Sequence, residues 1–484
     1  MIMKKIKFII CTLITLSVIT GCTKDYEELN TDPNNPVAVP AHLLLGTTQR
    51  VYMNVMHGVL GGAGGDMGAV WAQLWSKVQY NSEERYIPRR TVIDNIWDNT
   101  FASVISEASA MEELAAAEGN TNLQAAAIIM QASGFQFMTE LFGPIPFTEA
   151  MDPSILKPVY DDETTIYNGI IDMYSQAASL LANGSGEIVA SSDLFYGGDV
   201  TKWRKLANTL KFRALMRISS TQNVSSELQA LVNGGYLMTS NDDDAQVSYT
   251  AVQPDANPIY ELIDYGARLE YKVNELVVER MKTLNDDRLP LYAAPADSDG
   301  EYRGKPAGYG DLTALPNEAL GYTYANISGL GDFYLNPELP GVLMSFSELS
   351  FLMAEAATEG YISGGLDAAL SYYYTGIEAS YEFHGISPSA YIAQEGLGFA
   401  NQNDARQKIG EEKWLALFGQ GFEAWTEWRR TNFPVLTPAV EGDINQIPSR
   451  YYYPTTEPSL NSENNAAAAS SIGGDELTSA LFWQ

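Results

Sequence analysis

The stretch "FLMAEAATEGYISGGLDAALSYYYTGIEA", residues 351–379, decides the fold class. Small residues and one aromatic recur in it at Ala357, Ala369, Tyr373 and Gly376. Small residues let two antiparallel helices approach closely, while the ring fills the gap to the next pair. The pattern therefore predicts a helix hairpin of the tetratricopeptide kind. An ordinary antiparallel helix pair is an equally good interpretation of this segment alone.

Helical periodicity extends outward from this hairpin over most of the chain. Apolar residues recur at spacings of three and four, which is typical of amphipathic helices. We expect helices over residues 41–60, 66–80, 93–118, 121–141, 164–183, 200–220, 271–284, 345–360, 366–384 and 403–430. Strand patterns such as "DAQVSYT" at 244–250 are short and scattered. The sequence thus predicts a mainly α protein built from irregular helix pairs.

Two stretches interrupt the helical pattern, at about 285–345 and 431–472. Within the first, residues 291–335 contain seven glycines, three prolines and six tyrosines. Loops of this aromatic density, held on a rigid helical scaffold, are where ligand contacts tend to lie. We therefore predict a loop-rich ligand-binding face, with Tyr302, Tyr322 and Tyr324 as candidate ligand-binding residues.

A second aromatic segment, "WAQLWSKVQYNSEERY", covers residues 71–86. Trp71 and Trp75 would lie one turn apart on the expected helix, with Tyr80 near its end. Aromatic residues at this spacing usually form a buried stripe. Beside polar neighbours such as Gln73, they could instead form a flat platform for the apolar faces of sugar rings or peptide side chains. Both interpretations stay open, and Trp71, Trp75 and Tyr80 join the candidate ligand-binding residues.

No catalytic or metal-binding constellation is evident. The three histidines, His42, His57 and His384, lie outside any zinc motif. The glycines at 61–68 follow a helical pattern, whereas a nucleotide-binding loop would follow a strand. The acidic segment 297–301 lacks several ligand positions of a calcium loop. We predict no catalytic residue, no bound metal and no cofactor.

The chain is strongly acidic, with a formal net charge of -31 over 484 residues. Nucleic acid is excluded as a partner, because no basic patch could neutralise phosphates. The same field disfavours heavily anionic ligands unless a local basic pocket overrides it. The chain has only two cysteines, so packing must supply its stability.

The N-terminus is typical of a secreted lipoprotein. Three lysines precede an uncharged run, Phe8 to Gly21, which indicates a signal peptide over residues 1–21. The run is too short for a permanent membrane span. The following "ITGC" resembles a bacterial lipobox, which predicts that Cys22 carries lipid and anchors the protein to a membrane. A plain signal peptide with a bystander cysteine is the alternative.

Residues 22–40 are predicted to form an extended tether. The segment "NTDPNNP" at 30–36 combines residues that break helices and favour turns. An acidic run follows Cys22 directly, and on composition alone it is a solvated linker. We expect residues 41–484 to form a single α domain.

Several ordered blocks together resemble the SusD/RagB family of outer-membrane nutrient-binding lipoproteins. These blocks are the lipobox at Cys22, "NTDPNNP", "LFGPIPFTEA" at 141–150, "DVTKWRKLANTLKFRALMRIS" at 199–219, "SFSELSFLMAEAA" at 345–357, "EKWLALFGQGFEAWTEWRRTNFP" at 412–434 and "IPSRYYYP" at 447–454. The resemblance covers nearly the whole chain after the signal peptide. Only Cys22 matches a functional position of the family, because its other motifs are scaffold.

The resemblance implies a non-enzymatic, lipid-anchored protein exposed on the outer membrane. Such a protein would bind oligosaccharides and pass them to a SusC-like TonB-dependent barrel. Peptides are the rival ligand for the same transporter. A lipid-anchored glycoside hydrolase and a purely structural partner of the barrel are two further alternatives.

Overall fold

The structure is a computed structural model that describes residues 39–309, 322–394 and 396–484. The long helices are α3 (Ala41–His57), α4 (Arg90–Thr100), α5 (Ser106–Ala117), α6 (Thr121–Phe142), α7 (Glu163–Ala182), α8 (Val200–Arg217), α9 (Ser225–Gly234), α11 (Glu275–Thr283), α13 (Phe346–Thr358), α14 (Gly365–Phe383), α16 (Gln402–Ala416), α17 (Gly421–Thr431) and α19 (Ser462–Ser471). Short helices are α10 (Pro258–Tyr260), α12 (Leu289–Tyr292), α15 (Ser389–Ile392) and α18 (Glu457–Leu460). Single turns of other helix types are η1 (Gly65–Ala69), η2 (Phe101–Ile105), η3 (Ala190–Ser192), η4 (Asn241–Asp243) and η5 (Glu261–Tyr265). The protein is mainly α, as predicted.

The strands form three two-stranded antiparallel sheets. β1 (Trp75–Lys77) pairs with β5 (Tyr271–Val273), β2 (Ile145–Pro146) with β3 (Tyr160–Asp161), and β4 (Ala245–Val247) with β6 (Gly341–Met344). These short sheets join segments that are far apart in the sequence, and most of the mass lies in the helices.

The predicted hairpin is present as the antiparallel pair α13 and α14. A Cβ at Gly376 would lie 2.8 Å from the ring of Phe351, so only glycine fits at this helix contact. The buried rings of Phe351 and Tyr373 meet edge to face with centroids 6.1 Å apart. Ser347 adds a hydrogen bond of 2.8 Å from its Oγ to the Gly376 carbonyl.

Further helix pairs pack in sequence order. α5 contacts α6, α6 contacts α7, and α7 contacts α8. Asp199 caps α8 by accepting hydrogen bonds from the amides of Thr201 and Lys202, which satisfies two of the amides left open at a helix start. Local caps and apolar stripes thus explain why these helices lie close to their predicted bounds.

The helical scaffold is joined internally by buried ion pairs. The guanidinium of Arg217 on α8 is fully buried and binds Glu140 of α6 together with Glu423 and Glu427 of α17. A buried cation of this kind is tolerated because hydrogen-bonded carboxylates surround it. The network ties the middle of the chain to its C-terminal helices.

Two predicted helices are wrong in part. Residues 66–80 form the turn η1 and strand β1, and the predicted helix 271–284 begins with strand β5. The glycine-rich turn packs against α17 so closely that a Cβ at Gly68 would lie 2.7 Å from the amide nitrogen of Phe422. Pairing of β1 with β5 therefore overrides the helical spacing of the local sequence.

Other differences are smaller. The predicted helix 403–430 is two helices, α16 and α17, separated by a short turn. The predicted loop region 431–472 ends in the helices α18 and α19, and α9 lies in a segment where we expected no helix.

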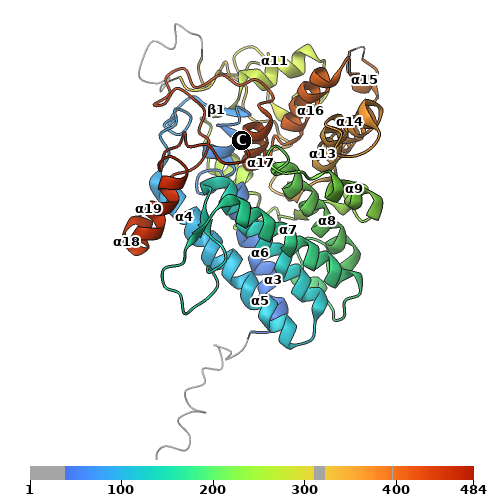
Figure 1. The fold of residues 1–484 in the computed structure, drawn as a ribbon. Helices are drawn as coiled ribbons and strands as arrows, with labels where there is room; N and C mark the ends of the chain where they lie inside the picture. The colour runs from blue at the N-terminus through green and yellow to red at the C-terminus, as the bar shows by residue number, and fades with distance from the viewer. Residues whose placement is uncertain (1–38, 310–321, 395) are drawn as a thin grey trace, which may run out of the picture.

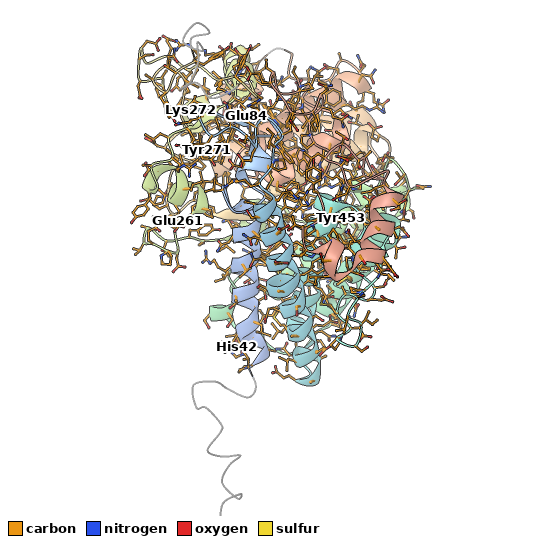
Figure 2. The ribbon with its side chains drawn as sticks, turned by 90° about the vertical axis from the view of Figure 1, so that its left-hand side faces the viewer. His42, Glu84, Glu261, Tyr271, Lys272 and Tyr453 are labelled. Atoms are coloured by element: carbon orange, nitrogen blue, oxygen red, sulfur yellow. The ribbon has the colours of Figure 1, made fainter. Side chains whose placement is uncertain are left out.

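The first long helices of the chain lie together at one end of the molecule (Figure 1). Figure 1 shows α3 to α8 side by side at one end of the molecule, with β1 and α11 towards the other end. Figure 2 shows His42, at the start of α3, at the end opposite to Glu84, Tyr271 and Lys272. The segment around β1 and β5 thus lies far from the place where α3 begins.

Candidate functional site

A cavity of about 560 Å³ opens beside the N-terminus of α11, and we call it the ligand groove. It is lined by Gln73, Asn274, Glu275, Leu276, Glu279, Pro306, Ala307, Tyr309, Tyr322, Val435, Thr437, Pro438 and Val440. Its volume falls in the range of about 300–1,000 Å³ that is usual for small-molecule sites. The groove lies between the two loop-rich stretches.

Aromatic and aliphatic groups form the walls of the ligand groove. The rings of Tyr309 and Tyr322 lie with centroids 5.7 Å apart and planes inclined by 42°, and both residues are half-buried. Val435 and Val440 line the groove with 75% and 57% of their surface exposed. Such surfaces suit the apolar face of a sugar ring or a peptide side chain.

A buried amide lies in the lining of the ligand groove. The Oδ1 of Asn274 accepts a hydrogen bond of 2.9 Å from the amide of Leu276 and thereby caps α11. Its Nδ2 has no hydrogen-bond partner among the described residues, although Asn274 is only 2% exposed. An unsatisfied buried donor is costly and rare in native proteins. The amide is therefore a candidate contact for a ligand hydroxyl or carbonyl.

Polar side chains of the segment 73–84 bind the loops that form the groove. Gln73 donates through Nε2 to the carbonyl of Thr437, and Asn81 donates through Nδ2 to the carbonyl of Tyr309. The Lys305 ammonium lies 3.1 Å from the Glu84 carboxylate, and both side chains are fully buried. One short segment thus supports loops from two distant parts of the chain.

The electrostatics of the ligand groove are mildly negative. Glu275 and Glu279 lie on α11 at the groove, and among its described lining residues there is no cation. Partial burial, and to a lesser degree Glu279, raises the pKa of Glu275. Burial likewise raises the pKa of Glu84, whereas the nearby Lys305 ammonium lowers it. The groove therefore favours neutral ligands over anionic ones.

Trp71 and Trp75 do not form the exposed platform that we considered. They are 1% and 2% exposed. The Trp71 ring meets Trp425 at 5.1 Å, and its Nε1 donates to the Glu83 carbonyl at 2.8 Å. Trp75 faces Tyr271 at 6.2 Å across the β1–β5 pair. Their assignment as ligand-binding residues is thus wrong, because both rings belong to the core.

The four candidate tyrosines are spread around this region. Tyr322 lines the groove. Tyr324 packs against Val78 and donates to Gln79 at 2.7 Å, whereas Tyr302 packs against the main core. Tyr80 is 57% exposed, with the guanidinium of Arg268 5.5 Å from its ring. The structure therefore brings only Tyr322 of the four into the ligand groove.

Sequence reasoning missed several lining residues. The predicted candidates do not include Asn274, Glu275, Val435 and Val440. Tyr309 is one of the six tyrosines of the predicted loop, but it is not a predicted ligand-binding residue. The signal for Tyr309 was the same tyrosine-rich loop that contains Tyr322. For Asn274 the only signal was a helix-capping residue before α11, which does not indicate a ligand site.

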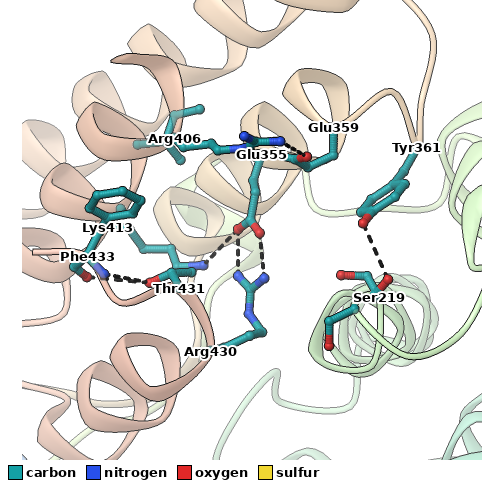
Figure 3. Close-up of a pocket in the computed structure, with 12 residues that line it drawn as sticks. Ser219, Glu355, Glu359, Tyr361, Arg406, Lys413, Arg430, Thr431 and Phe433 are labelled. Carbon is teal, nitrogen blue, oxygen red and sulfur yellow. Dashed lines mark hydrogen bonds and ion pairs between the residues drawn. The ribbon is translucent and has the colours of Figure 1, made fainter. Parts of the chain in front are cut away.

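A second cavity, of about 210 Å³, lies between α13, α16 and α17 (Figure 3). Its charged groups neutralise one another: Arg430 pairs with Glu355, and Arg406 pairs with Glu359. Lys413 pairs with Glu427 beside it. Since these charges already have partners, we assign this cavity to the scaffold.

The acidic segment 297–301 contains an ion pair. Asp299 accepts a hydrogen bond of 2.8 Å from Arg303, which neutralises its carboxylate. In the described part of the chain, no group of three or more His, Cys, Asp or Glu side chains is placed to hold a metal ion.

The helix pairs thus carry a tyrosine-walled groove with a buried amide in its lining. A family described as "Starch-binding associating with outer membrane", the SusD-like family, matches residues 33–454. The chain therefore belongs to the SusD-like family. No match to a curated protein is found.

Solved structures share the fold over almost the whole chain. A chitin-binding protein is 24% identical, with a TM-score of 0.79, and the alignment covers 91% of this chain and 99% of that one. A chitin-binding SusD homolog from Flavobacterium johnsoniae is 23% identical, with a TM-score of 0.76 and coverage of 92% and 97%. A SusD-like protein from Bacteroides thetaiotaomicron is 25% identical, with a TM-score of 0.77 and coverage of 92% and 98%.

Proposed function

We propose that the ligand groove binds a neutral oligosaccharide. The observation that carries this proposal is the unpartnered Asn274 amide beside the ring pair of Tyr309 and Tyr322. Rings contact the apolar faces of sugars, and a fixed donor selects the position of a hydroxyl or carbonyl oxygen. The family description and the chitin-binding neighbours support a glycan as the ligand.

We expect binding without bond cleavage. The two carboxylates of the groove, Glu275 and Glu279, lie one turn apart on the same helix. A glycoside hydrolase instead needs its two carboxyl groups on either side of the scissile bond. The protein would accordingly hold the glycan and release it unchanged.

The groove is tested by screening residues 39–484 on arrays of neutral glycans and peptides. The affinity for each bound ligand is then measured by titration. Tyr322→Ala and Asn274→Ala should each weaken glycan binding by about fivefold, because each removes one contact of roughly 1 kcal/mol. Tyr265→Ala is the matched control, since Tyr265 is 66% exposed and does not line the groove.

The outcomes separate the alternatives. If the protein binds peptides and Tyr322→Ala abolishes that binding, the ligand of the groove is a peptide. Turnover of a glycan that Glu275→Gln abolishes would make the protein a hydrolase. Glycan binding that neither groove variant changes would overturn the assignment of the groove.

We also propose that the protein is lipid-anchored at Cys22 and exposed on the outer membrane. Residues 1–38, which include the predicted signal peptide, Cys22 and most of the tether, lie outside the described residues. In the part that the structure describes, no helix is long and apolar enough to span a membrane. The outer-membrane association of the family supports this location.

We propose a SusC-like TonB-dependent barrel as the partner that receives the glycan. This partnership rests on family membership. We also propose that residues 41–484 form a single domain, because one cluster of buried apolar residues has members from Ala41 to Trp483. Copurification of the barrel with the tagged full-length protein from its own membranes tests the partnership. Recovery of the tagged protein without any barrel would contradict it.

A further inference from the structure

A third cavity, of about 290 Å³, lies at the C-terminal end of α17, and we call it the Arg429 cavity. It is lined by Trp428, Arg429, Asn432, Leu436, Pro438, Gln446, Ile447, Ser449 and Gln484. Pro438 borders both this cavity and the ligand groove. The volume is large enough for one small polar molecule.

Arg429 is a buried cation without an ion-pair partner, and the Glu140 carboxylate favours its charge only from a longer distance. It is 4% exposed, and no carboxylate of the described residues lies within ion-pair distance of it. Every other arginine buried to this degree has such a partner: Arg213, Arg217, Arg288 and Arg450 each contact a carboxylate. Burying a charge is costly unless it is paired. The unpaired guanidinium therefore indicates a missing anion.

The hydrogen bonds of Arg429 leave two of its N–H groups without a partner among the described residues. Nη1 donates to the carbonyls of Glu140 and Ser449 at 2.7 and 2.8 Å, and Nη2 donates to Thr426 Oγ1 at 2.9 Å. Nε is buried and has no partner among the described residues. Arginine has five N–H groups, so Nε and one N–H of Nη2 remain. These two nitrogens share the edge that can bind both oxygens of a carboxylate.

The guanidinium is also held in a fixed orientation. Its Cζ lies 3.7 Å from the centroid of the Trp425 ring and 5.0 Å from that of Trp483. Burial lowers the pKa of Arg429 to about 9, so the side chain remains a cation at neutral pH. A preorganised cation of this kind binds a planar anion with little loss of conformational entropy.

We propose that the Arg429 cavity binds the carboxylate group of a small polar ligand, at a site separate from the ligand groove. Asn432 and Gln446 line the same cavity and can bond hydroxyl or amide groups next to that carboxylate. Two sources carry this chemistry: the uronic acid of an acidic glycan and the C-terminal carboxylate of a peptide. A local cation is needed for either, because the chain as a whole repels anions.

The test is isothermal titration calorimetry on the purified protein with matched acidic and neutral probes. Glucuronate is compared with glucose, and an N-acetylated dipeptide with its C-terminal amide. Wild-type protein should bind an acid and not its neutral counterpart. Gln446→Glu places a negative charge at the exposed edge of the cavity and should weaken binding by about tenfold or more, whereas Gln446→Met should not.

Arg429→Lys provides a second measurement, since it keeps the charge but loses the two-nitrogen edge. It should also weaken carboxylate binding by about tenfold. Because this change also affects packing on Trp425, Gln446→Glu alone decides whether the site exists if Arg429→Lys fails to fold. Tyr322→Ala should leave carboxylate binding unchanged, which separates this site from the ligand groove.

The probes also identify the source of the carboxylate. Binding of glucuronate alone assigns the cavity to acidic sugars, and binding of the dipeptide alone assigns it to peptide termini. Equal binding of acidic and neutral probes, no binding by either, or unchanged affinity in Gln446→Glu would overturn the proposal.

Discussion

Replacement of Lys305 by methionine should destabilise the protein strongly through its effect on Glu84. The Lys305 ammonium is fully buried and lies 3.2 and 3.1 Å from the two carboxylate oxygens of Glu84, and 3.1 Å from the carbonyl of Pro306. In Lys305→Met the Glu84 carboxylate stays buried without a counter-charge. Removing one partner of a buried pair costs about 3–5 kcal/mol, and we expect this loss near pH 7.

The loss should depend on pH with a defined sign. Burial already holds the pKa of Glu84 above its ordinary value of 4.5, and Lys305 is the main group that lowers it. Without Lys305 this pKa rises further. A carboxyl whose folded pKa is raised favours folding below its unfolded pKa, and this contribution is lost as the pH rises. Lys305→Met should thus be nearly as stable as wild type at pH 4 and lose up to about 1.4 kcal/mol per pH unit above that.

The assay is guanidinium-induced unfolding of both proteins at pH 4, 5.5 and 7. Adding Glu84→Met to Lys305→Met removes the unpaired charge and should restore stability to within about 1 kcal/mol of wild type. Lys282→Met is the matched control, because its pair with Glu279 is exposed and contributes at most about 0.5 kcal/mol. A pH-independent loss, or a double variant less stable than the single one, would refute the reasoning.

Three further outcomes are expected. Trp71→Ala and Trp75→Ala should each cost about 3–5 kcal/mol in chemical unfolding because they leave cavities in the core; retention of full stability would contradict their burial. Burial lowers the pKa of His384 to about 4, so this histidine contributes a loss of about 3 kcal/mol as the pH falls from 6.5 to 4, and the stability difference between wild type and His384→Gln should change by that amount; parallel profiles would exclude the contribution. Cys22→Ser should release the protein from membranes in fractionation, and unchanged partition would refute lipid anchoring.

The helical scaffold could be predicted from the sequence because its signals are local. The hairpin 351–379 carries small residues at its contact positions, and Asp199 marks the start of α8. Such signals need only residues three or four positions apart. The bounds of α3, α6, α7, α13 and α14 accordingly lie within three residues of the predicted ones.

The segment around Trp75 could not be predicted in this way. Its partner strand begins at Tyr271, and the glycine-rich turn before it is shaped by contact with Gly421. These contacts join residues that are far apart in the chain, and no local spacing reports them. The same spacing of four that indicates a helix face therefore occurs here in a turn followed by a strand.

The ligand groove was predicted only in outline for the same reason. The tyrosine-rich loop indicated the correct region, and Tyr322 lies in the groove. Val435 and Val440, which also line the groove, come from a stretch more than a hundred residues later. Asn274 is buried in the folded chain, and its Nδ2 has no partner among the described residues. A single sequence reveals neither property.

The support of both groove walls by Gln73 and Asn81 has a consequence for the width of the groove. These two side chains donate hydrogen bonds to the carbonyls of Thr437 and Tyr309. Gln73 and Asn81 are only eight positions apart in the sequence. The two loops are also joined directly, since the amides of Val440 and Glu441 donate to the carbonyls of Ala307 and Gly308 at 3.3 and 3.0 Å. A shift of the common segment would therefore move both loops as one body and leave the width of the groove unchanged, which makes the groove a preformed site.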